Sequence, residues 1–140
     1  EVVYALDRNG AAVECTRENA ARNGWNDIRV MQSDLFSAVP SGMRFDMIVF
    51  NQFYYPSDID WFGDSSDGGE SIITRFFNDM TPFLAPGAVI VMSFADFAGN
   101  ANDPAVLGRA RGYEVDEITY VQDQYGKAKV VVIYPDAQIE

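Results

Sequence analysis

Strand and helix signals alternate along this chain from end to end, and this alternation most constrains how it can fold. Short apolar runs are typical of parallel strands that are covered on both faces. Between the first two runs lies a segment rich in Ala, Glu and Arg, with Asn9 placed to cap a helix and Gly24 to close it. The sequence therefore predicts strands at 2–6, 28–32 and 45–50 and a helix over 11–23.

The second half continues the pattern. Apolar residues recur at the spacing of one helical face between Ile73 and Leu84, with Pro82 placed to tighten or end that helix. Pro86-Gly87 predicts a turn before the next strand, and Gln124-Tyr125-Gly126 predicts a hairpin. The predicted elements are a strand at 88–94, a short helix at 104–111 and strands at 113–121 and 127–134.

This order of elements predicts an α/β fold, a Rossmann-like, doubly wound and mostly parallel sheet with helices on both faces. The C-terminal hairpin implies an antiparallel strand at or near one edge. Ligands of such folds bind beyond the carboxyl ends of the strands, near the switch point of the strand order. The residues at these ends are Asp7, Ser33, Asp34 and the segment from Asn51 onward.

Composition and charge exclude several kinds of site and partner. The chain has 140 residues, which suits one domain, and carries 10 Lys+Arg against 21 Asp+Glu, a formal charge of -11. That charge repels a phosphate backbone, so nucleic acid is not an expected partner. The absence of histidine excludes the usual Ser-His-Asp and Cys-His sites, and no metal site is expected. The lone Cys15 fits a reducing compartment, and no apolar run is long enough to span a membrane. A cytoplasmic protein is therefore expected.

Two aspartates each follow a predicted strand. Asp7 could accept hydrogen bonds from the two hydroxyls of a nucleotide ribose, or its charge could help to start the following helix. Asp34, after Ser33, could accept the exocyclic amine of an adenine, or simply belong to a turn. Position alone leaves both alternatives open at each residue.

The third strand runs into Asn51, with Tyr54 three residues later. An amide oxygen can accept an N–H group while an aromatic ring stacks on the same planar nitrogen group. The other interpretation is a turn asparagine beside loop aromatics that pack down. From Asn51 to Gly69 the periodicity disappears, which predicts a long loop. Its aspartates could line a pocket for an amine-bearing acceptor, or form a solvated surface: Asp58, Asp60, Asp64 and Asp67.

Together these segments resemble the class I S-adenosylmethionine-dependent methyltransferases. They are most similar to the small-methyltransferase-domain group, which includes the release-factor glutamine methyltransferases. The resemblance runs from Val2 to about Val132 and depends on the order and separation of its parts. These parts are the strand-to-helix segment 7–20, Ser33-Asp34-Leu35-Phe36, the strand Phe45 to Asn51, Asp67-Gly68-Gly69-Glu70 and Phe83-Leu84-Ala85-Pro86-Gly87.

The resemblance implies transfer of a methyl group from S-adenosylmethionine to a nitrogen, or otherwise an oxygen, of a small-molecule or protein acceptor. It implies that Asp7 holds the cofactor ribose and Asp34 the adenine amine, with Arg8, Ser33 and Leu35 completing that part of the site. Asn51 and Tyr54 would form the catalytic pair, and Asn51 would also contact the cofactor.

The chain departs from the family pattern in two places. The glycine-rich loop that follows the family's first strand has no counterpart here, so the chain is expected to be an N-terminally incomplete domain. Asn51-Gln52-Phe53-Tyr54 also stands where amide- and adenine-methylating members have Asn-Pro-Pro-Tyr. Both departures favour the alternative hypothesis, a non-catalytic, degenerate methyltransferase fold that serves as a binding or assembly module. A nicotinamide-dependent oxidoreductase is a more distant alternative.

Overall fold

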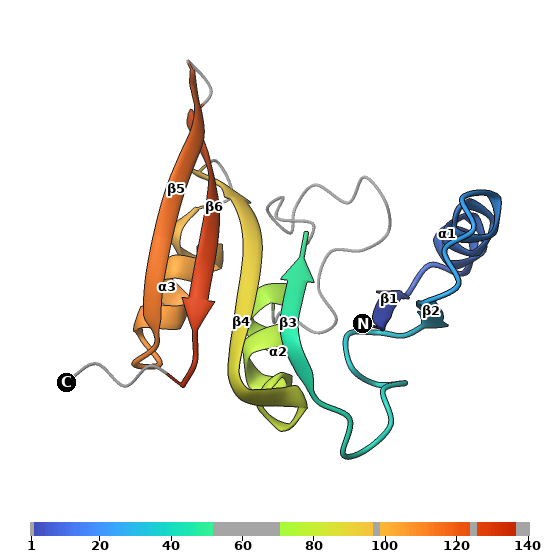
Figure 1. Ribbon diagram of the computed structural model, residues 1–140. Helices are drawn as coiled ribbons and strands as arrows, with labels where there is room; N and C mark the ends of the chain where they lie inside the picture. Colours follow the sequence, from blue (N-terminus) through green and yellow to red (C-terminus); the bar gives the residue numbers. More distant parts are fainter. Residues whose placement is uncertain (1, 52–70, 97–98, 124–125, 137–140) are drawn as a thin grey trace. The chain divides into compact units, whose positions relative to one another are not determined.

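The computed structural model describes residues 2–51, 71–96, 99–123 and 126–136, and the chain divides into two compact units (Figure 1). Unit 1 is Glu1–Met43 and unit 2 is Arg44–Glu140. Each unit is described by itself below. In the described residues no helix has both the length and the apolar character needed to cross a membrane.

Unit 1 is a strand–helix–strand unit with a two-stranded parallel sheet. It consists of β1 (Val3–Asp7), α1 (Gly10–Arg22) and β2 (Ile28–Gln32). The Asn9 side chain accepts hydrogen bonds from the backbone N–H groups of Ala11 and Ala12, which confirms the predicted N-cap. Gly24, at φ +68°, follows the helix as predicted.

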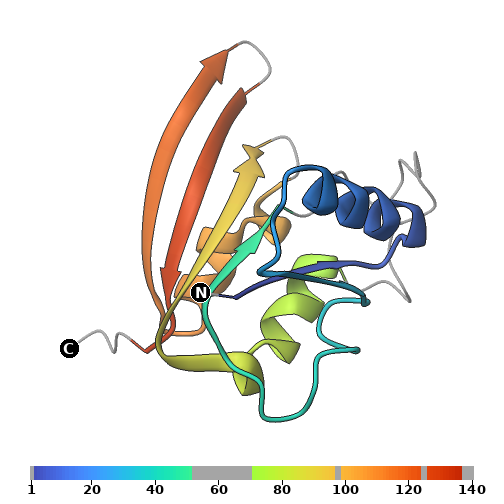
Figure 2. The same cartoon turned by 45° about the vertical axis from the view of Figure 1, so that its right-hand side comes forward.

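Unit 2 contains a four-stranded sheet in the order β3-β4-β6-β5. β3 and β4 are parallel, whereas β6 is antiparallel to both of its neighbours, and the long, curved β5–β6 hairpin extends beyond the end of β4 (Figure 2). The predicted α/β fold with a closing antiparallel hairpin is therefore confirmed. The elements are β3 (Phe45–Phe50), α2 (Ile72–Asp79), η1 (Thr81–Phe83), β4 (Leu84–Ala95), η3 (Asn100–Asn102), α3 (Pro104–Arg109), β5 (Glu114–Asp123) and β6 (Gly126–Tyr134).

The start of β4 corrects the sequence prediction. Pro86-Gly87 was expected to form a turn before a strand at 88–94, but β4 already begins at Leu84. The register explains this, because the pairing of β3 with β4 shifts between Phe45 and Met47. Such an irregularity accommodates a proline and a glycine inside a strand, and Gly87 takes a φ of +74° there. The helix before it ends at Asp79, and Pro82 lies in η1, as its position predicted.

The core of unit 2 lies between the sheet and helices α2 and α3, which are on the same face of the sheet (Figure 1). The rings of Phe50 and Phe76 stack at 4.7 Å between centroids, which joins β3 to α2. Gly108 of α3 lies close to β5 and β6, because a Cβ atom there would approach Val115 to 3.1 Å. The buried apolar residues of α2, β4 and β6 are Ile73, Phe76, Phe77, Ala88, Ile90, Met92, Phe94, Ala95, Val131 and Ile133.

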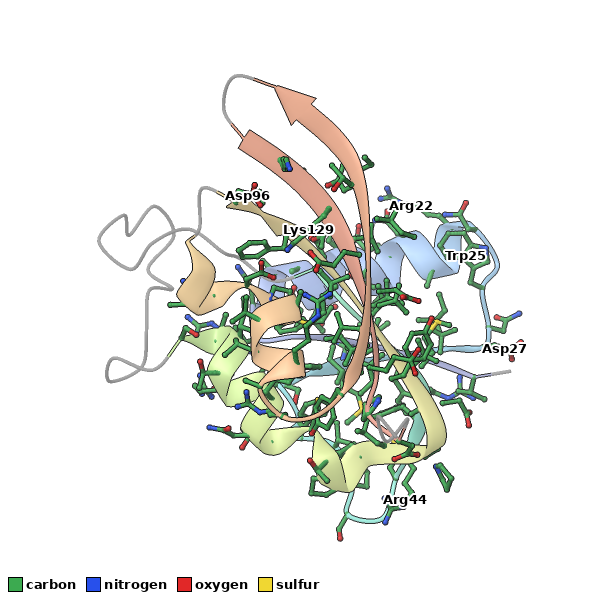
Figure 3. The ribbon with its side chains drawn as sticks, turned by 90° about the vertical axis from the view of Figure 1, so that its left-hand side faces the viewer. Arg22, Trp25, Asp27, Arg44, Asp96 and Lys129 are labelled. Carbon is green, nitrogen blue, oxygen red and sulfur yellow. The ribbon has the colours of Figure 1, made fainter. Side chains whose placement is uncertain are left out.

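Two charged side chains of the described residues are buried in unit 2, Lys129 and Asp103. Lys129 of β6 is only 8% exposed, and its ammonium group contacts Asp103 Oδ2 and Glu117 Oε2, each at 2.6 Å. The other carboxylate oxygens continue the network, because Glu117 Oε1 pairs with Arg109 and Asp103 Oδ1 accepts the backbone N–H of Ala105 at the start of α3. Figure 3 shows Lys129 directed from the hairpin toward the side of the sheet that α3 covers. This network, termed the Lys129 network, fastens α3 to the hairpin.

The Lys129 network is expected to make the stability of the protein depend on pH. The hydrogen bond from Lys129 lowers the pKa of Glu117 below its ordinary value of 4.5, against the opposing effect of burial. When the pKa of a carboxyl group is lower in the folded than in the unfolded state, the group stabilises the fold at pH values above its unfolded pKa. This contribution is lost as the pH falls through the folded pKa. The difference in unfolding free energy between the wild type and Glu117→Gln should therefore be constant near neutral pH and shrink below about pH 4.5.

Urea unfolding of both proteins at intervals between pH 3 and pH 8 measures this difference. Asp116→Asn is the matched control, because Asp116 neighbours Glu117 on β5 and is exposed. The prediction would be contradicted if the difference in unfolding free energy between the wild type and Glu117→Gln stayed unchanged down to pH 3.

Candidate functional site

The carboxyl ends of β1 and β2 lie side by side in unit 1. The two strands are parallel and pair Asp7 with Gln32, and the backbone N–H of Ser33 donates to the carbonyl of Asp7 at 2.9 Å. The structure therefore brings Asp7 next to Ser33, and the chain continues from there into Asp34 and Leu35. We refer to Asp7, Arg8, Ser33, Asp34 and Leu35 as the strand-end cluster.

Asp7 is exposed, and its carboxylate already has one local partner. Its Oδ1 atom accepts the backbone N–H of Asn9 at 2.8 Å, so this side chain does support the start of α1. A carboxylate offers about four acceptor positions, and this bond leaves capacity for a pair of hydroxyl donors. The two interpretations of Asp7 are therefore compatible with each other.

Sequence reasoning missed Gln32, which shapes the same cluster. Its Nε2 atom donates to the carbonyl of Arg8 at 2.9 Å and so ties the turn after β1 to the end of β2. The side chain also lies against Gly10, where an added Cβ would meet it at 3.6 Å. A polar residue at the last position of the strand, directly before Ser33, was the available signal in the sequence.

The chain after β2 forms a tight turn around Ser33. This buried hydroxyl donates to the carbonyl of Leu35 at 2.8 Å and accepts the backbone N–H of Ala38 at 3.0 Å. Leu35 takes a φ of +47°, an uncommon and costly conformation for a residue with a branched side chain. Asp34 belongs to this turn, and its Oδ1 atom is buried. The turn alternative at Asp34 thus describes its backbone, whose N–H donates to the Ser37 hydroxyl at 3.2 Å.

The remaining predicted site residues belong to unit 2 or to undescribed segments. Asn51 directly follows β3, is exposed, and accepts a hydrogen bond on Oδ1 from the Ser93 hydroxyl of β4. We refer to Asn51 and Ser93 as the amide pair. Tyr54 and the acidic loop residues lie outside the described residues, as does the Asp67-Gly68-Gly69-Glu70 element.

The strand-end cluster fits the groups of an adenosine. An exposed carboxylate at the end of a parallel strand can accept two neighbouring hydroxyls, and a second carboxylate one strand away can accept an exocyclic amine. The cluster lies at the edge of the sheet where such folds bind ligands. The amide pair presents an acceptor oxygen and two N–H donors at the corresponding end of β3.

Comparison with known proteins identifies the family. The model of the methyltransferase small domain matches residues 1–99. The chain belongs to the methyltransferase small domain family. Protein YbxB of Bacillus subtilis is 43% identical over 49 residues, a match that covers 35% of this chain and 24% of YbxB. The family supplies the context in which the strand-end cluster and the amide pair are interpreted.

Solved structures with the same fold are methyltransferases. A methyltransferase from Pyrococcus furiosus matches 99% of this chain and 64% of its own length, with a TM-score of 0.70 and 20% identity. Ribosomal protein L11 methylase from Lactobacillus delbrueckii matches 95% of this chain and 57% of its own length, with a TM-score of 0.66 and 20% identity. A Streptococcus mutans protein solved in complex with SAH matches 95% of this chain and 75% of its own length, with a TM-score of 0.66 and 14% identity. These likenesses establish the fold that the chain shares with these methyltransferases. The chain spans less than two thirds of the first two of these proteins and 24% of YbxB.

Proposed function

We propose that this protein transfers a methyl group from S-adenosylmethionine to a nitrogen atom of an acceptor, or less readily to an oxygen atom. The observation that carries the proposal is the strand-end cluster, in which Asp7 lies beside Ser33 at the carboxyl ends of two parallel strands in a chain of this family. The Streptococcus mutans protein of the same fold, solved in complex with SAH, supports the choice of cofactor.

In this proposal the strand-end cluster holds the cofactor. The Asp7 carboxylate accepts both ribose hydroxyls, and the Asp34 carboxylate accepts the adenine amine. The Gln32–Arg8 and Ser33–Leu35 hydrogen bonds keep the surrounding backbone in position, so that little ordering is needed when the cofactor binds. Arg8 and Leu35 flank the two carboxylates in the chain and complete this part of the site.

The bound cofactor supplies an electrophilic methyl group on a sulfonium, and the protein has to position the acceptor and keep water out. Asn51 accepts an N–H group of the acceptor on its Oδ1 atom and thereby aims the nitrogen lone pair. Tyr54 stacks on the acceptor, in keeping with the sequence interpretation. Displacement at the methyl carbon needs no protein nucleophile, and the proton that the methylated nitrogen loses would pass to solvent.

The acceptor in this proposal is a small molecule or a protein. A fold neighbour that is named as a methylase of ribosomal protein L11 supports a protein acceptor. The formal charge of -11 favours an acceptor that carries positive charge or an amine. We also propose a cytoplasmic location, which the lone cysteine supports.

A second candidate is a non-catalytic module with the same fold. The specific observation in its favour is the sequence Asn51-Gln52-Phe53-Tyr54, which lacks the two prolines of the amide-methylating relatives. The assays below use the protein with its full natural sequence.

Replacing Asp7 tests the cofactor site. Asp7→Ala should weaken S-adenosylmethionine binding by about 1.5–3 kcal/mol, the scale of hydrogen bonds to a charged group. Isothermal titration calorimetry on the protein with its full natural sequence measures the affinity, and the melting temperature reports any damage to the start of α1. Asp27→Ala is the matched control, since Asp27 is an exposed aspartate of the same unit just before β2.

The outcomes separate the two candidates. Unchanged affinity in Asp7→Ala would remove this residue from the cofactor site. Absence of cofactor binding by the wild type would favour the non-catalytic module. Transfer of tritium from S-adenosyl-[methyl-³H]methionine to an extract of source cells that lack the protein tests catalysis directly. Separating the labelled extract by size then distinguishes a protein acceptor from a small-molecule acceptor.

A further inference from the structure

Ser93 is a polar residue in an otherwise apolar stretch of β4, Ala88 to Ala95. Side chains alternate between the two faces of a strand, and Ile90, Met92 and Phe94 are buried on one of them. Ser93 therefore belongs to the other face, together with Val89, Val91 and Ala95. Packing alone does not call for a hydroxyl there, because the neighbouring positions of this face on β4 are the apolar Val91 and Ala95.

The strand register places Ser93 beside Asn51. Phe50 of β3 pairs with Met92 of β4, so Asn51 and Ser93 are the next residues along two parallel neighbours. Phe50 stacks on Phe76 of α2, which means that Asn51 points toward the opposite face, where Ser93 also lies. The Ser93 hydroxyl donates a hydrogen bond to Oδ1 of Asn51 across this gap.

This bond constrains the Asn51 amide. The terminal torsion of an asparagine is broad, and Asn51 is exposed, so its oxygen and nitrogen could exchange places by rotation. A hydroxyl donor on Oδ1 selects one orientation and leaves the second lone pair of that oxygen for another donor. The hydroxyl itself is held firmly, because β4 is paired with β3 on one side and with β6 on the other.

We propose that Ser93 is a positioning residue, which sets the orientation of the Asn51 amide for the acceptor nitrogen. This inference rests on the proposed function, in which Asn51 contacts the acceptor. Ser93 does not itself touch the acceptor or the cofactor in this scheme. It acts by keeping the Oδ1 atom of Asn51 aimed in one direction before the acceptor arrives.

The first measurement needs no acceptor. Side-chain ¹H–¹⁵N NMR of the protein with its full natural sequence follows the Nδ2 resonances of Asn51, which Asn51→Asp identifies by their loss. Ser93→Ala should shift these resonances and lower the order of the side chain, whereas Ser93→Thr keeps a hydroxyl and should retain the wild-type order. Val91→Ala, on the same face of β4, controls for a loss of packing. Asn51 resonances that are identical in Ser93→Ala and the wild type would overturn the proposal.

The second measurement is methyl transfer from S-adenosyl-[methyl-³H]methionine to a dilution series of the acceptor extract. Ser93→Ala should lower the maximal rate by about 5- to 10-fold, the scale of one neutral hydrogen bond, with Ser93→Thr largely restored and cofactor affinity unchanged. In an Asn51→Ala background Ser93→Ala should have no further effect, because the group it positions is gone.

The outcomes distinguish this proposal from the one on which it rests. If Asn51→Ala loses turnover but Ser93→Ala retains it, Ser93 is not a positioning residue while the proposed function stands. If Asn51→Ala retains full turnover, the acceptor site proposed for Asn51 fails, and the positioning role of Ser93 fails with it. Equal losses in Ser93→Ala and Ser93→Thr, in parallel with melting temperature, would assign Ser93 a purely structural role.

Discussion

Asn51→Ala is expected to lower methyl transfer about 100-fold while leaving the affinity for S-adenosylmethionine nearly unchanged. An interaction that is made mainly in the transition state changes the catalytic rate rather than ground-state binding. A pre-placed hydrogen-bonding group of this kind typically contributes about 100-fold. Rates of tritium transfer, cofactor affinity by calorimetry and melting temperature are to be measured on the same variants. The loss should be larger than that of Ser93→Ala, which removes only the positioning bond.

Tyr54 supplies a second test of the same acceptor site. Tyr54→Ala should lower turnover in the same direction through lost stacking, whereas Tyr54→Phe should be mild if the face of the ring is what matters. The matched control for Asn51→Ala is Asn26→Ala, a change at an exposed asparagine in the turn before β2, which should behave as the wild type.

The competing explanation for Asn51 gives a different pattern. If this residue only shapes the turn after β3, Asn51→Ala will lower the melting temperature, cofactor affinity and turnover together. A stable Asn51→Ala protein with full turnover would contradict its assignment to the acceptor site. The fold and the strand-end cluster would be unaffected by that result, since neither depends on Asn51.

Lys129→Met is expected to destabilise the protein by about 3 kcal/mol, because it leaves the buried Asp103 and the partly exposed Glu117 without their shared cation. We expect the lower end of the usual range for breaking a buried ion pair. Glu117 keeps its pairing with Arg109, and Asp103 keeps its hydrogen bond to the start of α3. Methionine preserves most of the side-chain volume, so lost packing contributes little.

Urea unfolding at neutral pH measures this effect, and Lys127→Met, an exposed position on the same strand, should change stability by no more than about 0.5 kcal/mol. Asp103→Asn removes the charge but retains a good helix cap. The double variant Lys129→Met with Asp103→Asn should therefore be less destabilised than the sum of the single variants. Stability equal to the wild type in Lys129→Met would show that the Lys129 network does not fasten α3 to the hairpin.

Local sequence signals were sufficient for most elements. Residues 28–32 and 45–50 are strands with the predicted bounds, because each is mostly apolar and is bounded by polar or turn-forming residues. The helix cap at Asn9 was also readable, since a cap involves only neighbouring residues. The start of β4 could not be predicted in this way. Pro86-Gly87 is a turn signal, but the irregular pairing with β3 allows both residues to lie within the strand.

The candidate site could likewise be predicted only in part. The sequence by itself determined that Asp7, Asp34 and Asn51 end predicted strands, and the parallel pairing of β1 with β2 follows from that order of elements. Only the tertiary structure decided that Ser93 donates to Asn51, 42 positions earlier in the chain, and that Lys129 meets Asp103, 26 positions earlier. Contacts of this kind depend on strand register, and a shift of one residue would turn Ser93 or Lys129 to the other face of the sheet. Register is fixed by the packing of the whole sheet against α2 and α3, which no local pattern in the sequence encodes.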